Sequence, residues 1–84
     1  MFKNKTQGGR NNICGKKIEL LRKNYKTKMS QRILAEKCQL YGVDIDKNAI
    51  QRIESGQRFI TDIEIKCFCK IFNISADELL SEIE

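Results

Sequence analysis

Four places in this chain carry the same signal for the start of a helix, and together they restrict the fold to a series of short helices. At each place a side chain that can cap a helix follows an apolar residue, which can fold over the first turn onto another apolar residue. The pairs are Met29/Leu34 around Ser30, Ile45/Ile50 around Asp46, Ile60/Ile65 around Thr61, and Ile74/Leu79 around Ser75. The starts at Thr61 and Ser75 also have Glu64 and Glu78 at the spacing of a capping box.

Apolar residues recur at helical spacing along the rest of the chain, and proline is absent. These patterns predict an all-α fold with five helices, near residues 12–24, 31–41, 47–55, 62–72 and 76–83. Gly56 and Asn73 are expected to end two of the helices, because both residues tolerate the left-handed conformation. With 84 residues the chain can build one modest core. We therefore expect one domain of residues 12–84 after a basic, disordered tail of residues 1–11.

Positive charge is concentrated in the N-terminal part of the chain. Residues 1–32 contain ten Lys and Arg side chains against one acid, residues 33–60 contain four of each, and residues 61–84 contain two against six. This distribution predicts an N-terminal half that attracts phosphate and an acidic C-terminal end that points away from it. A basic tail that only increases solubility is the alternative interpretation.

The residue types that most enzymes need are missing. The chain has no histidine, which is the most common general base and metal ligand. On a helix, Cys67 and Cys69 would point about 200° apart, so a metal site is not expected. No glycine-rich phosphate loop follows a predicted strand. We therefore expect neither an enzyme nor a bound cofactor.

The four cysteines are predicted to be free thiols. The N-terminus lacks the apolar segment of a secretory signal, and no apolar run approaches the roughly 18 residues of a membrane span. We therefore expect a cytoplasmic protein without a membrane segment, in which thiols stay reduced. Cys14, Cys38 and Cys69 fall at apolar positions of the helical patterns, whereas Cys67 is expected to be the most exposed.

The predicted helix at residues 47–55 carries the side chains that suit DNA recognition. Ile50 and Ile53 lie on one side, and the remaining surface presents Lys47, Asn48, Gln51 and Arg52. Asparagine can pair with adenine through two hydrogen bonds, and lysine or arginine can reach the acceptors of guanine in the major groove. A solvated polar face without a partner is the alternative interpretation of this helix.

The order of these segments resembles the lambda-repressor/Cro-like helix-turn-helix family, also called XRE. The resemblance covers roughly residues 12–82 and is carried by Ile13–Arg22, by Ser30, Gln31, Leu34 and Ala35, by Ile50–Gly56 and by Phe72–Leu80. It implies a five-helix lambda-repressor-like domain that binds double-stranded operator DNA through its second and third helices.

The resemblance also assigns roles to individual residues. It implies base-reading roles for Lys47, Asn48, Gln51 and Arg52. Contacts to the DNA backbone are expected from Gln31, Arg32, Ser55, Arg58 and Arg10. Arg22 and Glu54 match a structural ion pair that would hold the reading helix in place, and Ala35 matches a small residue that lets the second and third helices approach.

Two connections are longer than the family pattern. Residues 24–28 lengthen the first connection, and residues 38–46 lengthen the segment between the second and third helices by about five residues. The usual helix-turn-helix joins its two helices by roughly 3–4 residues. One extra turn on the second helix and a loop through Gly42 would absorb this insertion, while Ile45 and Ile50 still fix the start of the third helix.

Two functions from different classes fit the sequence. The first is a sequence-specific transcriptional regulator, acting as a repressor, that binds its operator as a weak homodimer through Leu80 and Ile83 of the last helix. The second is an antitoxin or another protein-interaction module whose DNA binding serves autoregulation. RNA binding is less compatible, because the major groove of A-form RNA is deep and narrow.

Overall fold

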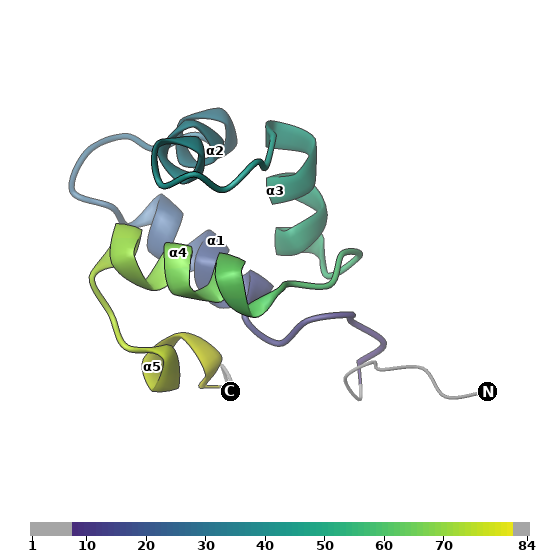
Figure 1. Cartoon of the computed structure of the whole chain (residues 1–84). Coiled ribbons are helices and arrows are strands. Elements are labelled where there is room, and N and C mark those ends of the chain that lie inside the picture. Colours follow the sequence, from purple (N-terminus) through teal and green to yellow (C-terminus); the bar gives the residue numbers. More distant parts are fainter. Residues whose placement is uncertain (1–7, 82–84) are drawn as a thin grey trace.

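The computed structural model of the chain describes residues 8–81, which form five helices joined by loops (Figure 1). The helices are α1 (Gly15–Lys23), α2 (Gln31–Leu40), α3 (Lys47–Ser55), α4 (Asp62–Phe72) and α5 (Ala76–Leu80). No strand occurs among the described residues, so the expected all-α class is confirmed. Within the same residues, no helix is long and apolar enough to cross a membrane.

The predicted capping residues begin four of the helices. The side chains of Ser30, Asp46, Thr61 and Ser75 each accept a hydrogen bond from the backbone amide three residues later. At Thr61 the capping box is complete, because the Glu64 carboxylate also accepts from the Thr61 amide at 3.0 Å. The predicted capping side chains therefore accept hydrogen bonds from backbone amides that the first turn of each helix leaves without partners.

Two helices end where the sequence predicts. Gly56 follows α3 with a φ of 85°, and Asn73 follows α4 with a φ of 56°. Both angles lie in the left-handed region, which glycine adopts without steric cost and asparagine tolerates. The backbone therefore turns sharply after α3 and again before α5.

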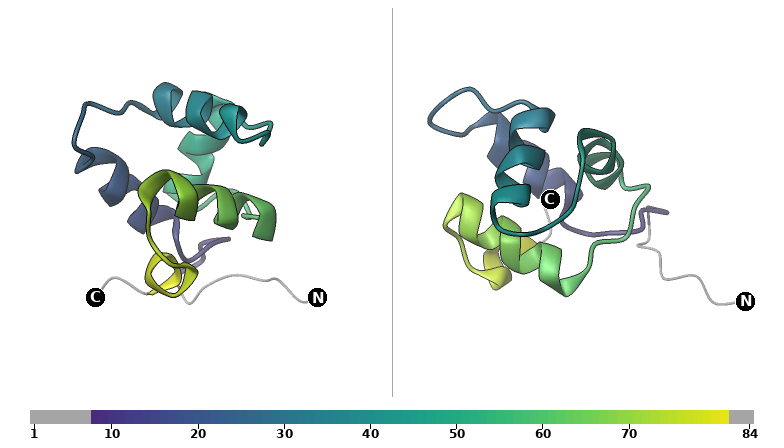
Figure 2. Two further views of the ribbon diagram at one scale, coloured as in Figure 1. Left: turned by 60° about the vertical axis from the view of Figure 1, so that its left-hand side comes forward. Right: turned by 45° about the horizontal axis from the view of Figure 1, so that its top comes forward.

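The core lies where α1 to α4 meet, and α5 closes it beneath α4, on the side away from α2 (Figure 2). Its largest fully buried side chains are Phe68, Ile18, Leu34, Ile50, Ile53 and Leu79. Each such side chain contributes about 1.5–3 kcal/mol by leaving water. Leu34, Ile50 and Leu79 are also the second residues of three of the apolar pairs that predicted helix starts. These side chains therefore anchor the first turns of their helices in the core.

The first helix starts later than residue 12. Asn12 Oδ1 accepts a hydrogen bond from the Gly15 amide at 2.8 Å, and α1 begins there. The residues before it run along the end of α3: the Asn11 amide donates to the Gly56 carbonyl at 2.8 Å and its side chain to the Gln57 carbonyl at 2.8 Å. Residue 11, which we expected in a disordered tail, is therefore held against the domain.

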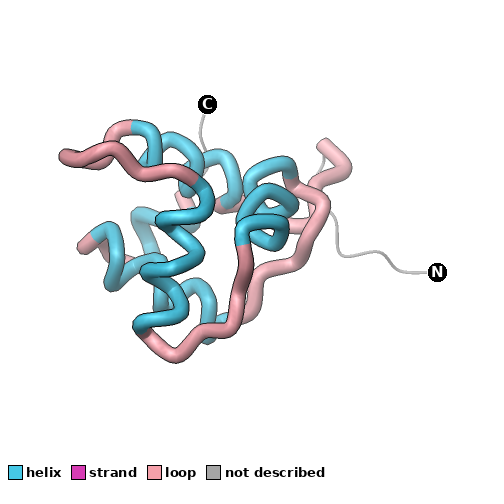
Figure 3. Tube along the Cα trace, turned by 90° about the horizontal axis from the view of Figure 1, so that it is seen from above, coloured by secondary structure: helices cyan, strands magenta, loops and turns pink. Residues whose placement is uncertain are grey.

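The connection between α2 and α3 is the predicted long loop (Figure 3). Gly42 turns the chain with a φ of 81°, and the Val43 amide donates back to the Cys38 carbonyl at 3.0 Å. The Gln39 side chain donates to the Ile45 carbonyl at 3.1 Å, while the Ile45 side chain is buried. The loop is thus fixed at both ends, and α3 starts in a defined direction.

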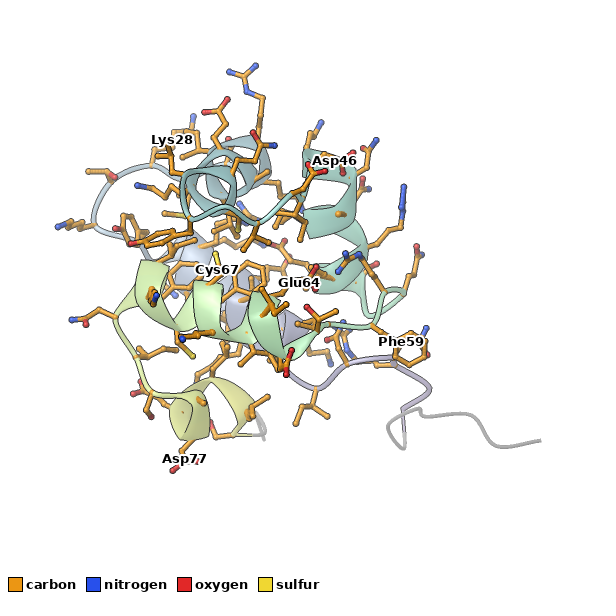
Figure 4. All side chains as sticks on the ribbon, viewed as in Figure 1. Lys28, Asp46, Phe59, Glu64, Cys67 and Asp77 are labelled. Atoms are coloured by element: carbon orange, nitrogen blue, oxygen red, sulfur yellow. The ribbon has the colours of Figure 1, made fainter. Side chains whose placement is uncertain are left out.

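The prediction that Cys67 is the most exposed cysteine is wrong. Cys67 is buried and Cys69 is half-buried. The expected inner side of α4 contained Ile65, Phe68 and Cys69, but the helix is rotated so that Glu64, Cys67, Phe68 and Ile71 face inward. Figure 4 shows Cys67 on the side of α4 that faces α2. On this inner side, Glu64 pairs with Arg58 and Cys67 belongs to the buried core.

Candidate nucleic-acid interface

The outer side of α3 presents four polar side chains together. Lys47, Asn48, Gln51 and Arg52 are exposed, whereas Ile50 and Ile53 on the inner side are completely buried. Within residues 8–81 none of these four side chains forms an intramolecular hydrogen bond or ion pair. The structure therefore brings the sequence-predicted base-reading residues onto one surface and leaves their hydrogen-bonding groups available.

Ser55 lies at the end of the same side of α3. It is exposed, and its hydroxyl donates to the Arg52 carbonyl at 3.2 Å. This bond closes the last turn of the helix and leaves the hydroxyl oxygen able to accept a further bond. The predicted contact from Ser55 to the DNA backbone stays a prediction.

A buried polar group lies directly behind the reading surface. The Arg22 Nε donates to Glu54 Oε2 at 2.7 Å and its Nη2 donates to Oε1 at 3.0 Å, which confirms the predicted pairing of these residues. Arg22 Nη1 also donates to the Met29 carbonyl at 3.1 Å, and Gln31 Nε2 donates to Glu54 Oε1 at 2.9 Å. We call Arg22, Gln31 and Glu54 the hub, because they connect α1, α2 and α3.

The hydrogen bonds of the hub favour the charged form of Arg22. Only 12% of the Arg22 side chain and 4% of the Glu54 side chain are exposed. The hydrogen bonds to Glu54 raise the pKa of Arg22, which outweighs the opposite effect of burial. A two-bond arginine–carboxylate pair also fixes orientation, so the hub holds α3 at a set angle to α1.

Gln31 was predicted to contact a DNA phosphate. In the structure its side chain donates to Glu54 instead, and the phosphate contact stays a prediction.

The C-terminal end of α3 is held by residues that precede α1. Arg10 Nη2 donates to the Glu54 carbonyl at 2.8 Å. The Asn12 side chain donates to the Ile53 carbonyl at 3.0 Å and to the Arg58 carbonyl at 2.7 Å. These bonds satisfy carbonyls that the last turn leaves without partners, and a cation is favoured at this end of a helix.

Arg10 was expected in the flexible tail, with its charge available to a phosphate. Its guanidinium instead points to the end of α3, because the carbonyls there attract a cation. Asn12 is a second structural residue that we did not identify from the sequence. Its bond to the Gly15 amide is local, but no local pattern signals its bonds to the Ile53 and Arg58 carbonyls, which lie more than forty positions further along the chain.

Arg58 is paired within the protein as well. Its Nη1 donates to Glu64 Oε1 at 2.8 Å and its Nη2 donates to Oε2 at 2.9 Å, while Nη1 also reaches the Phe59 carbonyl at 3.1 Å. Burial raises the pKa of Glu64, but the hydrogen bonds from Arg58 and Thr61 and the positive charge of Arg58 together outweigh this effect and leave that pKa below its ordinary value. The predicted contact from Arg58 to DNA would therefore have to compete with Glu64.

Two basic side chains lie at the start of α2. Lys28 precedes α2 and is exposed, and Arg32 lies in its first turn with a weak, exposed ion pair to Glu36 at 3.8 Å. Figure 4 shows Lys28 and Asp46 on the upper side of the molecule and Asp77 of α5 on the lower side. Lys28 thus places positive charge on the upper side of the molecule, and Asp77 of the acidic α5 lies on the opposite side.

Comparisons with protein-family models, with characterised proteins and with solved structures found no match to the chain. Among the residues that the structure describes, no group of three or more acidic or cysteine side chains is arranged to hold a metal ion.

Proposed function

We propose that the protein is a sequence-specific DNA-binding transcriptional regulator of the lambda-repressor-like type, which acts as a repressor by occupying its operator. The observation that carries the proposal is the outer side of α3, where the side chains of Lys47, Asn48, Gln51 and Arg52 are exposed and form no hydrogen bond or ion pair within the described protein. Helix recognition in the major groove needs such side chains on a rigid support, and the hub supplies that support.

Each exposed side chain on α3 has a distinct use in reading base pairs. Asn48 and Gln51 can each donate to and accept from adenine, and Arg52 can donate two bonds to guanine. Lys47 lies in the first turn, where its flexible ammonium can reach either guanine or a phosphate. The proposal therefore places direct base recognition on α3, with different bases read by different side chains.

The start of α2 is the proposed contact with the DNA backbone. Free amides at the N-terminus of a helix attract phosphate, and Arg32 and Lys28 add positive charge beside them. Such contacts set the position of the protein on DNA without reading sequence. Together with α3 they form a surface on two packed helices, as recognition by a helix pair requires.

The proposed weak dimer on DNA would use the end of the chain. Leu80 is only half-buried and packs against the core, so it offers part of its surface to a second copy. Ile83, the other residue of the predicted seam, lies outside the described residues. Sedimentation of the wild type and of Ile83→Glu, with and without operator DNA, tests this part of the proposal; a tight dimer free of DNA would exclude it.

Selection of bound sequences from random duplex DNA tests the main proposal. We expect a defined sequence preference and half-sites separated by about one helical turn. The selected DNA is then measured against a shuffled duplex at fixed salt, because non-specific binding depends strongly on ionic strength. No enrichment, or enrichment that survives alanine at all four outer positions of α3, would show that α3 does not read DNA.

The second candidate is a protein-interaction module that also binds its own promoter. It is favoured by one observation, a group of exposed apolar side chains away from α3. These side chains lie around an apolar groove, which is described next.

A further inference from the structure

An apolar hollow of about 500 Å³ lies between α1, the connection after it and the C-terminal end of α4. Leu20, Leu21, Ile71 and Phe72 form its apolar wall together with Tyr25. The rings of Tyr25 and Phe72 meet edge to face with their centres 6.1 Å apart, which fixes the shape of the wall.

A second hollow of about 270 Å³ shares Tyr25 and Ile71 with the first and adds Leu40 and Tyr41 at the end of α2. We call the two hollows together the Tyr25 groove. Leu40 is 87% exposed, the highest exposure among the large apolar side chains of the described residues, and Tyr41 is 52% exposed. An apolar groove with exposed apolar side chains at its edge is typical of a binding surface.

Lysines surround this groove. Lys17 and Lys26 line the larger hollow and Lys37 the smaller one, and no carboxylate lines either. The Lys37 ammonium lies 5.7 Å from the centre of the Tyr25 ring, and the Lys70 ammonium lies 6.0 Å from that of Tyr41. In residues 8–81 none of these lysines forms an ion pair, so the edge of the groove keeps its positive charge.

The Tyr25 groove lies away from the proposed DNA surface. No residue of α3 and none from the start of α2 lines it. In Figure 1 the α1–α2 connection and the C-terminal end of α4 lie on the left and α3 lies on the right. The groove and α3 therefore lie on different sides of the molecule, while Lys28 of the proposed backbone contact follows Lys26 of the groove by two residues.

We propose that the Tyr25 groove binds an acidic amphipathic helix of a partner protein. Apolar side chains spaced three and four residues apart on such a helix would enter the two hollows, and its Asp and Glu residues would face the lysines. The charge selects an acidic partner and excludes a basic one, because like charges across an interface are repulsive. The inference is independent of the proposed DNA recognition, since the two surfaces share no residue.

A second copy of this chain fits the groove less well than another protein. The short acidic helix of this chain is α5, which exposes Asp77 and Glu78. Among the described residues, none of the large exposed apolar side chains belongs to α5. An acidic helix without an apolar anchor would leave both hollows unfilled, and buried apolar anchors supply most of the binding energy at interfaces.

The test uses two displayed libraries of helix-forming peptides on the full-length protein. Both libraries carry Leu, Phe and Met on one side of the helix. The remaining positions are Asp and Glu in one library and Lys in the other. We expect enrichment from the acidic library only, and weaker binding at high salt. The binding of an enriched peptide is then measured with wild type, with Leu40→Gln/Tyr41→Gln, and with Ile63→Gln, which changes an exposed apolar residue of α4 outside the groove.

The proposal expects the groove variant to bind the enriched peptide on the order of tenfold more weakly, while Ile63→Gln and wild type bind it equally. The groove variant should also keep the same amide NMR pattern outside the groove, since Leu40 and Tyr41 are exposed. No enrichment, enrichment from the basic library, or equal binding by wild type and the groove variant would overturn the proposal. Self-association that the groove variant abolishes would assign the groove to a second copy and overturn it as well.

Discussion

The outer side of α3 and its inner side use polar residues in opposite ways. On the outer side, Asn48 and Arg52 make no bond within the described protein. On the inner side, the Glu54 carboxylate accepts three hydrogen bonds from Arg22 and Gln31. Flexible side chains can select bases only if the backbone that carries them is fixed. The contrast therefore predicts that substitutions on the two sides of one short helix affect different properties, binding on one side and stability on the other.

The largest effect is expected from breaking the hub. In Glu54→Ala the Arg22 guanidinium stays buried without its counter-ion, and we expect a loss of about 3–5 kcal/mol in the free energy of unfolding. Chemical denaturation measures it. Glu36→Ala is the matched control, because Glu36 forms only an exposed ion pair with Arg32 and should change stability by less than about 1 kcal/mol. Equal stability of the Glu54 and Glu36 variants would show that the hub does not hold α3.

The next effect concerns the close approach of α1 to α3. A Cβ atom at Gly15 would overlap the backbone carbonyl of Ile53, which cannot move without disturbing the end of α3. We expect Gly15→Ala to lower the free energy of unfolding by about 1–3 kcal/mol despite the better helix propensity of alanine. Lys16→Ala is the control, because Lys16 is exposed on the same turn. A stabilised Gly15 variant would mean that the two helices can separate at little cost.

Substitutions on the outer side of α3 should spare the fold. We expect Asn48→Ala and Arg52→Ala each to weaken binding to the selected DNA by about 1–3 kcal/mol and to relax preference at one or two base pairs. Their denaturation midpoints should match the wild type, since truncation of an exposed side chain opens no cavity. Competition between selected and shuffled DNA measures the preference. Unchanged preference in both variants would contradict the assignment of α3 as the reading helix.

The smallest effect is expected from Arg58 and Glu64. Because the pKa of Glu64 is lowered in the folded protein, its stabilising contribution is complete at neutral pH. That contribution falls as the pH drops below the ordinary carboxyl range, and it is lost below the lowered pKa. About a third of the Arg58 side chain is exposed, so we expect Glu64→Gln to cost only about 1 kcal/mol at pH 7. Denaturation should show the variant and the wild type converging in acid; a pH-independent difference would contradict the ion pair.

The sequence was most informative where partners lie within one helical turn. The caps at Ser30, Asp46, Thr61 and Ser75 were all predicted, because each joins a side chain to an amide three residues away. The same local reasoning failed for Cys67. The apolar pattern of α4 has two possible inner sides that differ by one residue, and only the packed structure shows that Glu64, Cys67, Phe68 and Ile71 face inward.

For the candidate site, the sequence predicted both the outer residues of α3 and the pairing of Arg22 with Glu54. It did not predict how Arg10 and Arg58 are used. We expected the charges of both arginines to be available for DNA, because the sequence does not show which group within the protein an arginine will bind. The structure directs Arg10 to the end of α3 and Arg58 to Glu64. Arg32 and Lys28 are therefore better candidates for backbone contacts than either of them.

What the sequence determined by itself is the set of helices, the starts of the last four and the side of α3 that faces solvent, since these depend on periodicity and on bonds between near neighbours. The tertiary structure alone decided which charges are already paired, that Asn12 secures the end of α3, and that Tyr25, Ile71 and Leu40 line a common groove. Those features join residues from different helices, and their positions depend on the angles at which the helices pack. A pattern along one chain does not encode such angles, because they result from the fit of all the buried side chains together.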